Sequence, residues 1–177
     1  IASGQGTLVG VTSVAAVDGV ATFSNLIVDD AGGLQLTLHA IVAPALVAES
    51  APFTIYQVAA SLVYQTQPVG DVLAGSPLAT QPTIEVHDAL GNIVVTGPQS
   101  VLDVSIVIGS GVGVLSGATT VSAVAGIASF AGLSVDNVGG APLTLQATAA
   151  SLAGADSAPF AIYQVATSLV FQTQPVG

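Results

Sequence analysis

The chain contains the stretch Tyr64-Gln-Thr-Gln-Pro-Val-Gly70, which returns near its end as Phe171-Gln-Thr-Gln-Pro-Val-Gly177. The two copies are 107 positions apart, since 171 minus 64 is 107. The same offset aligns residues 1–70 with residues 108–177 without a gap, and 42 of these 70 pairs are identical. Self-similarity at a fixed period indicates a repeat architecture. The sequence therefore predicts tandem copies of one folding unit.

A period of 107 residues is much longer than one coil of a solenoid and matches one β-sandwich domain of about 100 residues. We therefore expect residues 1–59 to be the C-terminal part of an immunoglobulin-like repeat, residues 60–165 a complete repeat, and residues 166–177 the first strand of the next. A partial sandwich would expose strand edges and core side chains. Its missing strands are expected from chain outside these residues or from another subunit by strand addition.

Alternation of apolar and polar side chains predicts the strands of the complete repeat. In Thr83–His87, Ile84 and Val86 fall on one face, while Glu85 and His87 fall on the other. The same alternation places Ile106 on the inner face of residues 100–108 and sets Leu145 apart from its polar neighbours in residues 143–148. Further strands are expected over 61–67, 100–108, 119–124, 127–130, 143–148 and 157–165, with turns rich in Gly, Asn and Asp between them. A period of two favours antiparallel sheets with one solvated face. The predicted fold class is all-β: tandem immunoglobulin-like sandwiches of about seven antiparallel strands each.

The composition excludes several classes of partner. There is no Lys or Arg, and the formal net charge is −10. Such a chain cannot neutralise phosphates, so we expect no binding to nucleic acid. No apolar run reaches the roughly 18 residues that a membrane helix requires, so we expect no direct membrane insertion. With no Cys, the chain has neither disulfides nor thiolate metal sites.

The complete repeat also carries a family pattern. Val86-x-Asp88-x-x-Gly91-Asn92-x-Val94 is followed by Gly111-x-Gly113-x-Leu115-Ser-Gly117 and by Gly126-x-Ala128-x-Phe130-x-x-Leu133. These motifs resemble the bacterial Ig-like (Big) domain repeats of invasin- and intimin-type adhesins and of giant secreted repeat proteins. The resemblance implies an extracellular or bacterial cell-surface location and a spacer, stalk or adhesive role. It implies no catalytic residues, and it places any host or surface receptor contact in other domains.

Nothing in the sequence predicts an enzyme. The only imidazoles are His39 and His87, and His39 aligns with Gln146 in the next repeat. A catalytic base would not be replaced by Gln between repeats that share a function. His87 is expected to be an exposed strand residue beside Glu85. We therefore predict no catalytic and no cofactor-binding residues.

Calcium is the one ligand that the sequence suggests. The adjacent pair Asp29 and Asp30 recurs as Asp136 and Asn137, and carboxylate and amide oxygens are the ligands that calcium prefers. Each pair is followed by x-Gly-Gly, so the alternative is a turn in which Asp or Asn bonds the backbone. Two adjacent side chains offer too few oxygens for a site with six to eight ligands. The turn is the preferred interpretation.

Three functions remain open from the sequence. Residues 160–169 join one repeat to the next without Gly or Pro, which predicts a semi-rigid rod rather than a flexible string. A chain with a mean hydropathy of +0.84 and few charges would also expose apolar surface, and such surface marks interaction sites. The main hypothesis is a structural module of an extracellular bacterial filament, sheath or stalk, with copies of itself as partners. The alternative is a passive spacer in a monomeric adhesin. Binding of glycans is a weaker possibility, because the chain has no Trp.

Overall fold

The computed structural model describes residues 1–29, 32–42, 46–136, 138–139 and 141–173, and these are nearly all β. The first six strands are β1 (Thr7–Val9), β2 (Ile27–Asp29), β3 (Gln35–Leu36), β4 (His39–Val42), β5 (Leu46–Glu49) and β6 (Phe53–Thr54). The others are β7 (Ala59–Thr66), β8 (Val72–Leu73), β9 (Thr83–Asp88), β10 (Asp103–Ser110), β11 (Val114–Ser116), β12 (Thr120–Ser122), β13 (Ile127–Ser129), β14 (Ser134–Asp136), β15 (Thr144–Thr148), β16 (Ala155–Asp156) and β17 (Ile162–Tyr163). A single 3-10 turn covers Pro98–Val101, and the described residues contain no α-helix. The all-β prediction is confirmed.

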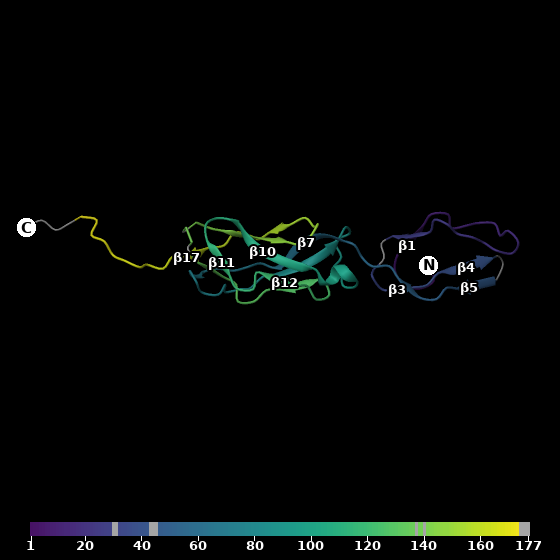
Figure 1. Ribbon diagram of the computed structural model, residues 1–177, viewed down its shortest axis with the longest axis horizontal. Helices are drawn as coiled ribbons and strands as arrows, with labels where there is room; N and C mark the ends of the chain where they lie inside the picture. The colour runs from purple at the N-terminus through teal and green to yellow at the C-terminus, as the bar shows by residue number, and fades with distance from the viewer. Residues whose placement is uncertain (30–31, 43–45, 137, 140, 174–177) are drawn as a thin grey trace, which may run out of the picture.

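From residue 59 to residue 163 the strands form a sandwich-like arrangement (Figure 1). The larger sheets have the orders β12-β10-β15-β16 and β13-β9-β7, and both are antiparallel. The chain forms more and shorter strands here than the predicted seven, and the register shifts within the β7–β9 and β10–β15 pairings. One pairing, between β8 and β17, is parallel, which differs from the antiparallel expectation.

One hydrophobic core connects the two larger sheets. Its members run from Ala59 to Ile162 in the sequence. Ile84 and Val86 of β9, Ile106 of β10 and Leu145 of β15 are all fully buried, on the faces that the alternation predicted. Burying a side chain of this size contributes about 1.5–3 kcal/mol. The core therefore stabilises residues 59–162 in a chain that has no Cys for disulfides.

The pairings of the first 58 residues recur 107 positions later. The register of β1 with β2, which places Leu8 opposite Val28, returns between β11 and β14, where Leu115 lies opposite Val135. The β4–β5 hairpin likewise returns as β15–β16. The sequence repeat is thus matched by a repeat of strand register.

Burial does not recur in the same way. Phe23 is 39% exposed, whereas Phe130, its counterpart 107 positions later, is 4% exposed. Ala21 and Ala40 are exposed, and their counterparts Ala128 and Ala147 are fully buried. Residues 1–58 therefore form an open half of the arrangement that residues 59–163 complete.

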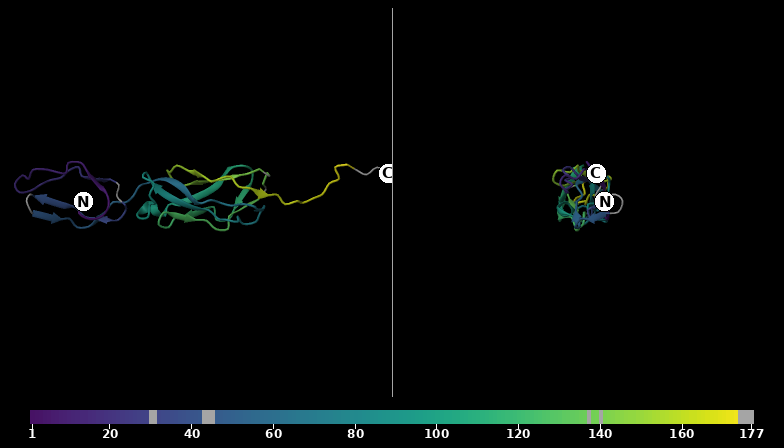
Figure 2. Two further views of the ribbon diagram at one scale, coloured as in Figure 1. Left: turned by 180° about the vertical axis from the view of Figure 1, so that it is seen from behind. Right: turned by 90° about the vertical axis from the view of Figure 1, so that its right-hand side faces the viewer.

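The two parts follow one another along the long axis of the molecule, with residues 164–173 extending beyond them (Figures 1 and 2). Residues 164–173 form no strand, and Leu169 is 99% exposed. This differs from the strand expected for residues 166–177, of which residues 174–177 lie outside the described chain. The physical reason is pairing: the equivalent strand β7 bonds to β9, and residues 166–173 have no such neighbour among the described residues.

Candidate functional site

The predicted calcium residues do not form a site in the described part of the chain. Asp29 ends β2 and Asp136 ends β14, each at an exposed strand position. Asp30 and Asn137 lie outside the described residues. Among the residues that the structure describes, no group of three or more His, Cys, Asp or Glu side chains could hold a metal ion. Calcium binding at these positions remains the less favoured alternative to the predicted turns, and it is untested.

The two histidines each contact a carboxylate. His87 Nε2 lies 2.7 Å from Glu85 Oε2 on β9, and both side chains are largely buried, with 17% and 13% exposed. The prediction of an exposed His87 is therefore wrong. Period-two alternation placed His87 and Glu85 on one face but could not show that the face is covered.

The second histidine belongs to a cross-strand pair. His39 Nε2 lies 3.6 Å from Glu49 Oε2 between β4 and β5. At the equivalent place in the next repeat, Gln146 Nε2 donates to Asp156 Oδ1 at 3.2 Å. The same contact is made with and without an imidazole, which fits a structural role for His39.

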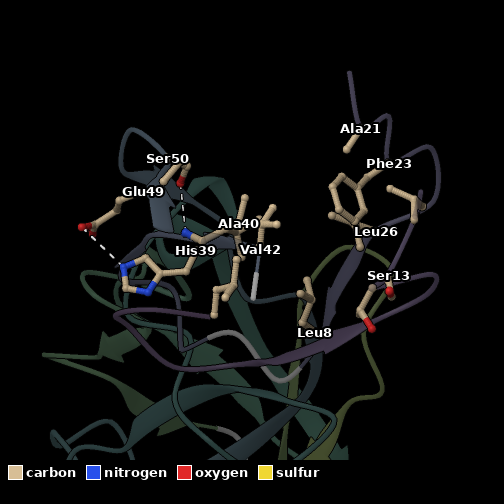
Figure 3. A pocket seen from close by; sticks show the side chains of 15 residues that line it. Leu8, Ser13, Ala21, Phe23, Leu26, His39, Ala40, Val42, Glu49 and Ser50 are labelled. Carbon is tan, nitrogen blue, oxygen red and sulfur yellow. Dashed lines mark hydrogen bonds and ion pairs between the residues drawn. The ribbon is translucent and has the colours of Figure 1, made fainter. Parts of the chain in front are cut away.

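An open cavity of about 510 Å³, here called the N-terminal cleft, lies within residues 8–50. Figure 3 shows Phe23 and Leu26 on one wall and Ala40 and Val42 on the other. Most of its lining is apolar, with Ser13 and the His39–Glu49 pair among the few polar side chains. An apolar hollow of this kind is a candidate binding site.

The junction, formed by contacts between residues 33–59 and residues 88–99, joins the two parts of the chain. Gln57 is 7% exposed, donates from Nε2 to Asp88 Oδ2 at 3.1 Å and accepts from the Val95 amide at 3.2 Å. Thr96 Oγ1 donates to the carbonyl oxygen of Gly33 at 2.7 Å. A buried amide with both ends bonded fixes one orientation of its neighbours. The junction is therefore a specific, hydrogen-bonded contact rather than a hinge.

Two further features strengthen the junction. The ring of Tyr56 lies so close to Gly97, whose φ is +84°, that a Cβ there would come within 2.6 Å of Tyr56 Cδ1. Asp88 is held by its surroundings: burial acts to raise its pKa, but hydrogen bonds from Asn92, Gln57 and the Leu90 amide outweigh this and lower the pKa. The Asp88 carboxylate, which accepts the hydrogen bond from Gln57 Nε2, is thus charged in the folded protein.

Sequence reasoning predicted a short, stiff connection but missed these contacts. The available signal was the recurrence of Ile-Tyr-Gln-Val at residues 55–58 and 162–165. Gln164, the second copy of Gln57, is exposed, and its Nε2 donates to the Val138 carbonyl oxygen at 3.0 Å. Gln57 is buried and Gln164 is exposed because different segments of the chain lie beside the two side chains.

No protein-family model matches the chain, and no curated protein matches it. Among solved structures, a crystal structure of a β-glycosidase from Bacteroides vulgatus is similar over 83% of this chain, with 14% identity and a TM-score of 0.42. The chain spans 20% of that protein's length. A likeness at this level carries no conclusion about family or activity. Separately, no helix among the described residues is long and apolar enough to cross a membrane.

Proposed function

We propose that the chain is a non-enzymatic structural module, a stretch of tandem immunoglobulin-like sandwiches that builds an extracellular bacterial filament, sheath or stalk. The observation that carries the proposal is the junction, where Gln57 bridges to Asp88 and Val95 and Thr96 bonds Gly33. Such contacts, repeated every 107 residues, would join successive sandwiches into a stiff rod.

The surface of the complete repeat supports assembly between rods. Val101, Val107, Val112 and Val124 are all exposed, the last of them to 75%. Apolar patches on a protein surface mark contacts with other molecules. With no Lys or Arg in the chain, Lys–carboxylate and Arg–carboxylate salt bridges are excluded, and apolar contacts with copies of itself are the favoured mode.

A passive spacer in a monomeric adhesin is the second candidate, because the same junction would also hold a single stalk straight. Negative-stain microscopy of a protein with four or more repeats distinguishes the two. Periodic bundles of several chains, with concentration-dependent sedimentation, support the filament. Single straight rods at all concentrations favour the spacer, and bent strings of beads contradict both.

Calcium is not required by this proposal. If the Asp29 and Asp136 positions held structural calcium, its removal by a chelator would lower the melting temperature, as loss of any ligand of the folded state does. We expect the melting temperature to be the same with chelator and with millimolar calcium. A rise with calcium would favour the calcium alternative over the turn.

A further inference from the structure

The beginning and the end of the complete repeat are bonded directly to each other. β8 and β17 pair in parallel. At one end of this pair the Asp71 amide donates to the carbonyl oxygen of Ala161 at 2.9 Å, and at the other the Ala74 amide donates to that of Tyr163 at 2.8 Å. No strand lies between the two segments, so a force that enters at one can pass straight to the other.

The chain enters and leaves this repeat at opposite ends. Residues 1–58 precede it at one end, and residues 164–173 extend from the other (Figures 1 and 2). Because β8 and β17 run in the same direction, tension along the chain pulls β8 back toward the entry and β17 forward toward the exit. Hydrogen bonds between strands run across them, so this tension loads the bonds together, in shear. We call residues 70–74 with residues 161–163 the terminal clamp.

The motif Tyr64–Gly70 builds the approach to this contact. Gln67 Oε1 accepts a hydrogen bond from the Ala158 amide at 2.9 Å. Gly70 lies so close to the end of the repeat that a Cβ there would overlap the carbonyl oxygen of Ala161. The same motif recurs at residues 171–177. The most recognisable repeat in the sequence therefore contains two residues that the contact between the two ends requires.

Asp71 has a backbone conformation that is unusual for its residue type. Its φ is +55°, in the left-handed region that residues other than Gly rarely adopt. Its side chain accepts a hydrogen bond from Tyr163 Oη at 3.3 Å, in addition to the bond from its amide to Ala161. Such a conformation persists where the surrounding contacts hold it, and it is often found at functional positions.

We propose that the terminal clamp is a mechanical element that makes the complete repeat resist stretching along the chain. Bonds that must break together raise the barrier to unfolding, and this barrier governs the rate of forced unfolding. The inference goes beyond the proposed function, because it requires neither lateral assembly nor a particular location. It applies equally to a repeat in a filament and to one in a single spacer.

The test stretches single molecules of the full 177-residue chain between two handles attached through introduced cysteines, since the chain has no Cys of its own. In the first geometry, Val58→Cys and Thr167→Cys place the handles at exposed positions before β7 and after β17, which loads the clamp in shear. In the second, Leu73→Cys and Thr167→Cys place both handles at the same end of the β8–β17 pair. Tension then opens its bonds one after another.

We expect the unfolding force to be at least about twofold higher in the first geometry, because several hydrogen bonds, each worth about 1 kcal/mol, resist together. Equal forces in the two geometries, or a higher force in the second, would overturn the proposal. The measurement is made on single tethered chains. A failure here would therefore leave the proposed assembly standing, and a failure to assemble would leave the clamp standing.

A pair of glycine variants tests the clamp within the first geometry. Gly70→Ala brings a Cβ against the Ala161 carbonyl oxygen, and we expect the unfolding force to fall to near the value of the second geometry. Gly126→Ala is the matched control, because its Cβ also meets a backbone carbonyl oxygen, that of Val94, but outside the clamp. Its effect on the force should be clearly smaller.

An equal or larger loss of force in Gly126→Ala would show that general destabilisation, and not the clamp, sets the mechanical strength. Circular dichroism establishes that each variant is folded before it is stretched. If Gly70→Ala does not fold, the comparison of the two pulling geometries in the chain with Gly70 intact decides the question by itself.

Discussion

Thr96 donates its hydroxyl to the carbonyl oxygen of Gly33 at 2.7 Å, across 63 residues of sequence. This bond joins the loop between β9 and the 3-10 turn to the segment just before β3. Gly33 is a required partner, because a Cβ there would lie 2.3 Å from Thr96 Oγ1. The two residues therefore define the junction as an interface with its own packing.

Weakening the junction should broaden the distribution of distances between the two parts of the chain. In Asp88→Asn, the new amide would face Gln57 Nε2, while Oδ1 could still accept from the Leu90 and Asn92 amides. With Thr96→Val added, two of the three hydrogen bonds described for the junction are lost, and the bond from the Val95 amide to Gln57 remains. Spin labels on Ala51→Cys and Ala131→Cys, two exposed positions in a chain without Cys, report the distance by double electron–electron resonance.

We expect a single narrow distribution of spin–spin distances for the unsubstituted chain and a clearly wider distribution for the double variant. Ser110→Ala, which removes an exposed bond to Thr144 far from the junction, is the control. An equally wide distribution in all three proteins would mean that the junction contacts do not restrict motion in solution.

Gly126→Ala should destabilise the complete repeat more than Gly91→Ala. Both glycines have a positive φ, +79° and +85°, so an Ala at either position costs about 1–2 kcal/mol in backbone strain. Only Gly126 is also against backbone, 2.5 Å from the Val94 carbonyl oxygen, while Gly91 has nothing within 4 Å. Overpacking adds about 1–3 kcal/mol. Urea unfolding of the two variants measures the difference, and equal losses would contradict the packing described here.

Tyr64 should make the fold sensitive to alkali. Its hydroxyl donates to the Leu145 carbonyl at 3.1 Å, and burial, with the charge of Asp156 as a smaller cause, raises the pKa of Tyr64 well above its usual value. Because the folded state holds this proton more tightly than the unfolded state, its contribution is complete below pH of about 10 and is lost as pH rises further.

In Tyr64→Phe we expect a loss of about 0.5 kcal/mol at neutral pH, at the low end for a hydrogen bond, since the Ser157 amide also bonds the same carbonyl. The variant should then lose less stability than the parent between pH 10 and 12. Tyr163→Phe, at an exposed bond to Asp71, is the control. Parallel pH curves for Tyr64→Phe and its parent would show that Tyr64 does not carry the effect.

Ser157→Ala should destabilise the fold by about 1–3 kcal/mol, because it leaves a buried donor without a partner. Ser157 is 6% exposed, and its Oγ accepts from the Leu145 amide at 2.9 Å while donating to the Ala158 carbonyl. The exposed Ser110→Ala, where water can replace the lost bond, should change the free energy of unfolding by less than about 0.5 kcal/mol. Denaturant unfolding followed by circular dichroism compares them.

Much of the complete repeat could be predicted from sequence. The faces of Ile84, Val86, Ile106 and Leu145 followed from alternation, since side-chain direction along a strand is a local property. The parallel β8–β17 pairing could not, because it joins residues about 90 positions apart through backbone bonds that leave no mark in composition. The predicted exposure of His87 was wrong, because alternation shows which face a side chain takes but not whether other residues cover that face.

The candidate site shows most clearly which properties follow from the sequence and which follow from the tertiary structure. The 107-residue period and the strand pattern are properties of the chain read in order, and the sequence by itself determined both. Phe23 and Phe130, or Gln57 and Gln164, have closely matching sequence neighbours but opposite exposure. Only the tertiary structure decided which copy is covered, because burial depends on the segments that fold against a residue and not on the residues beside it.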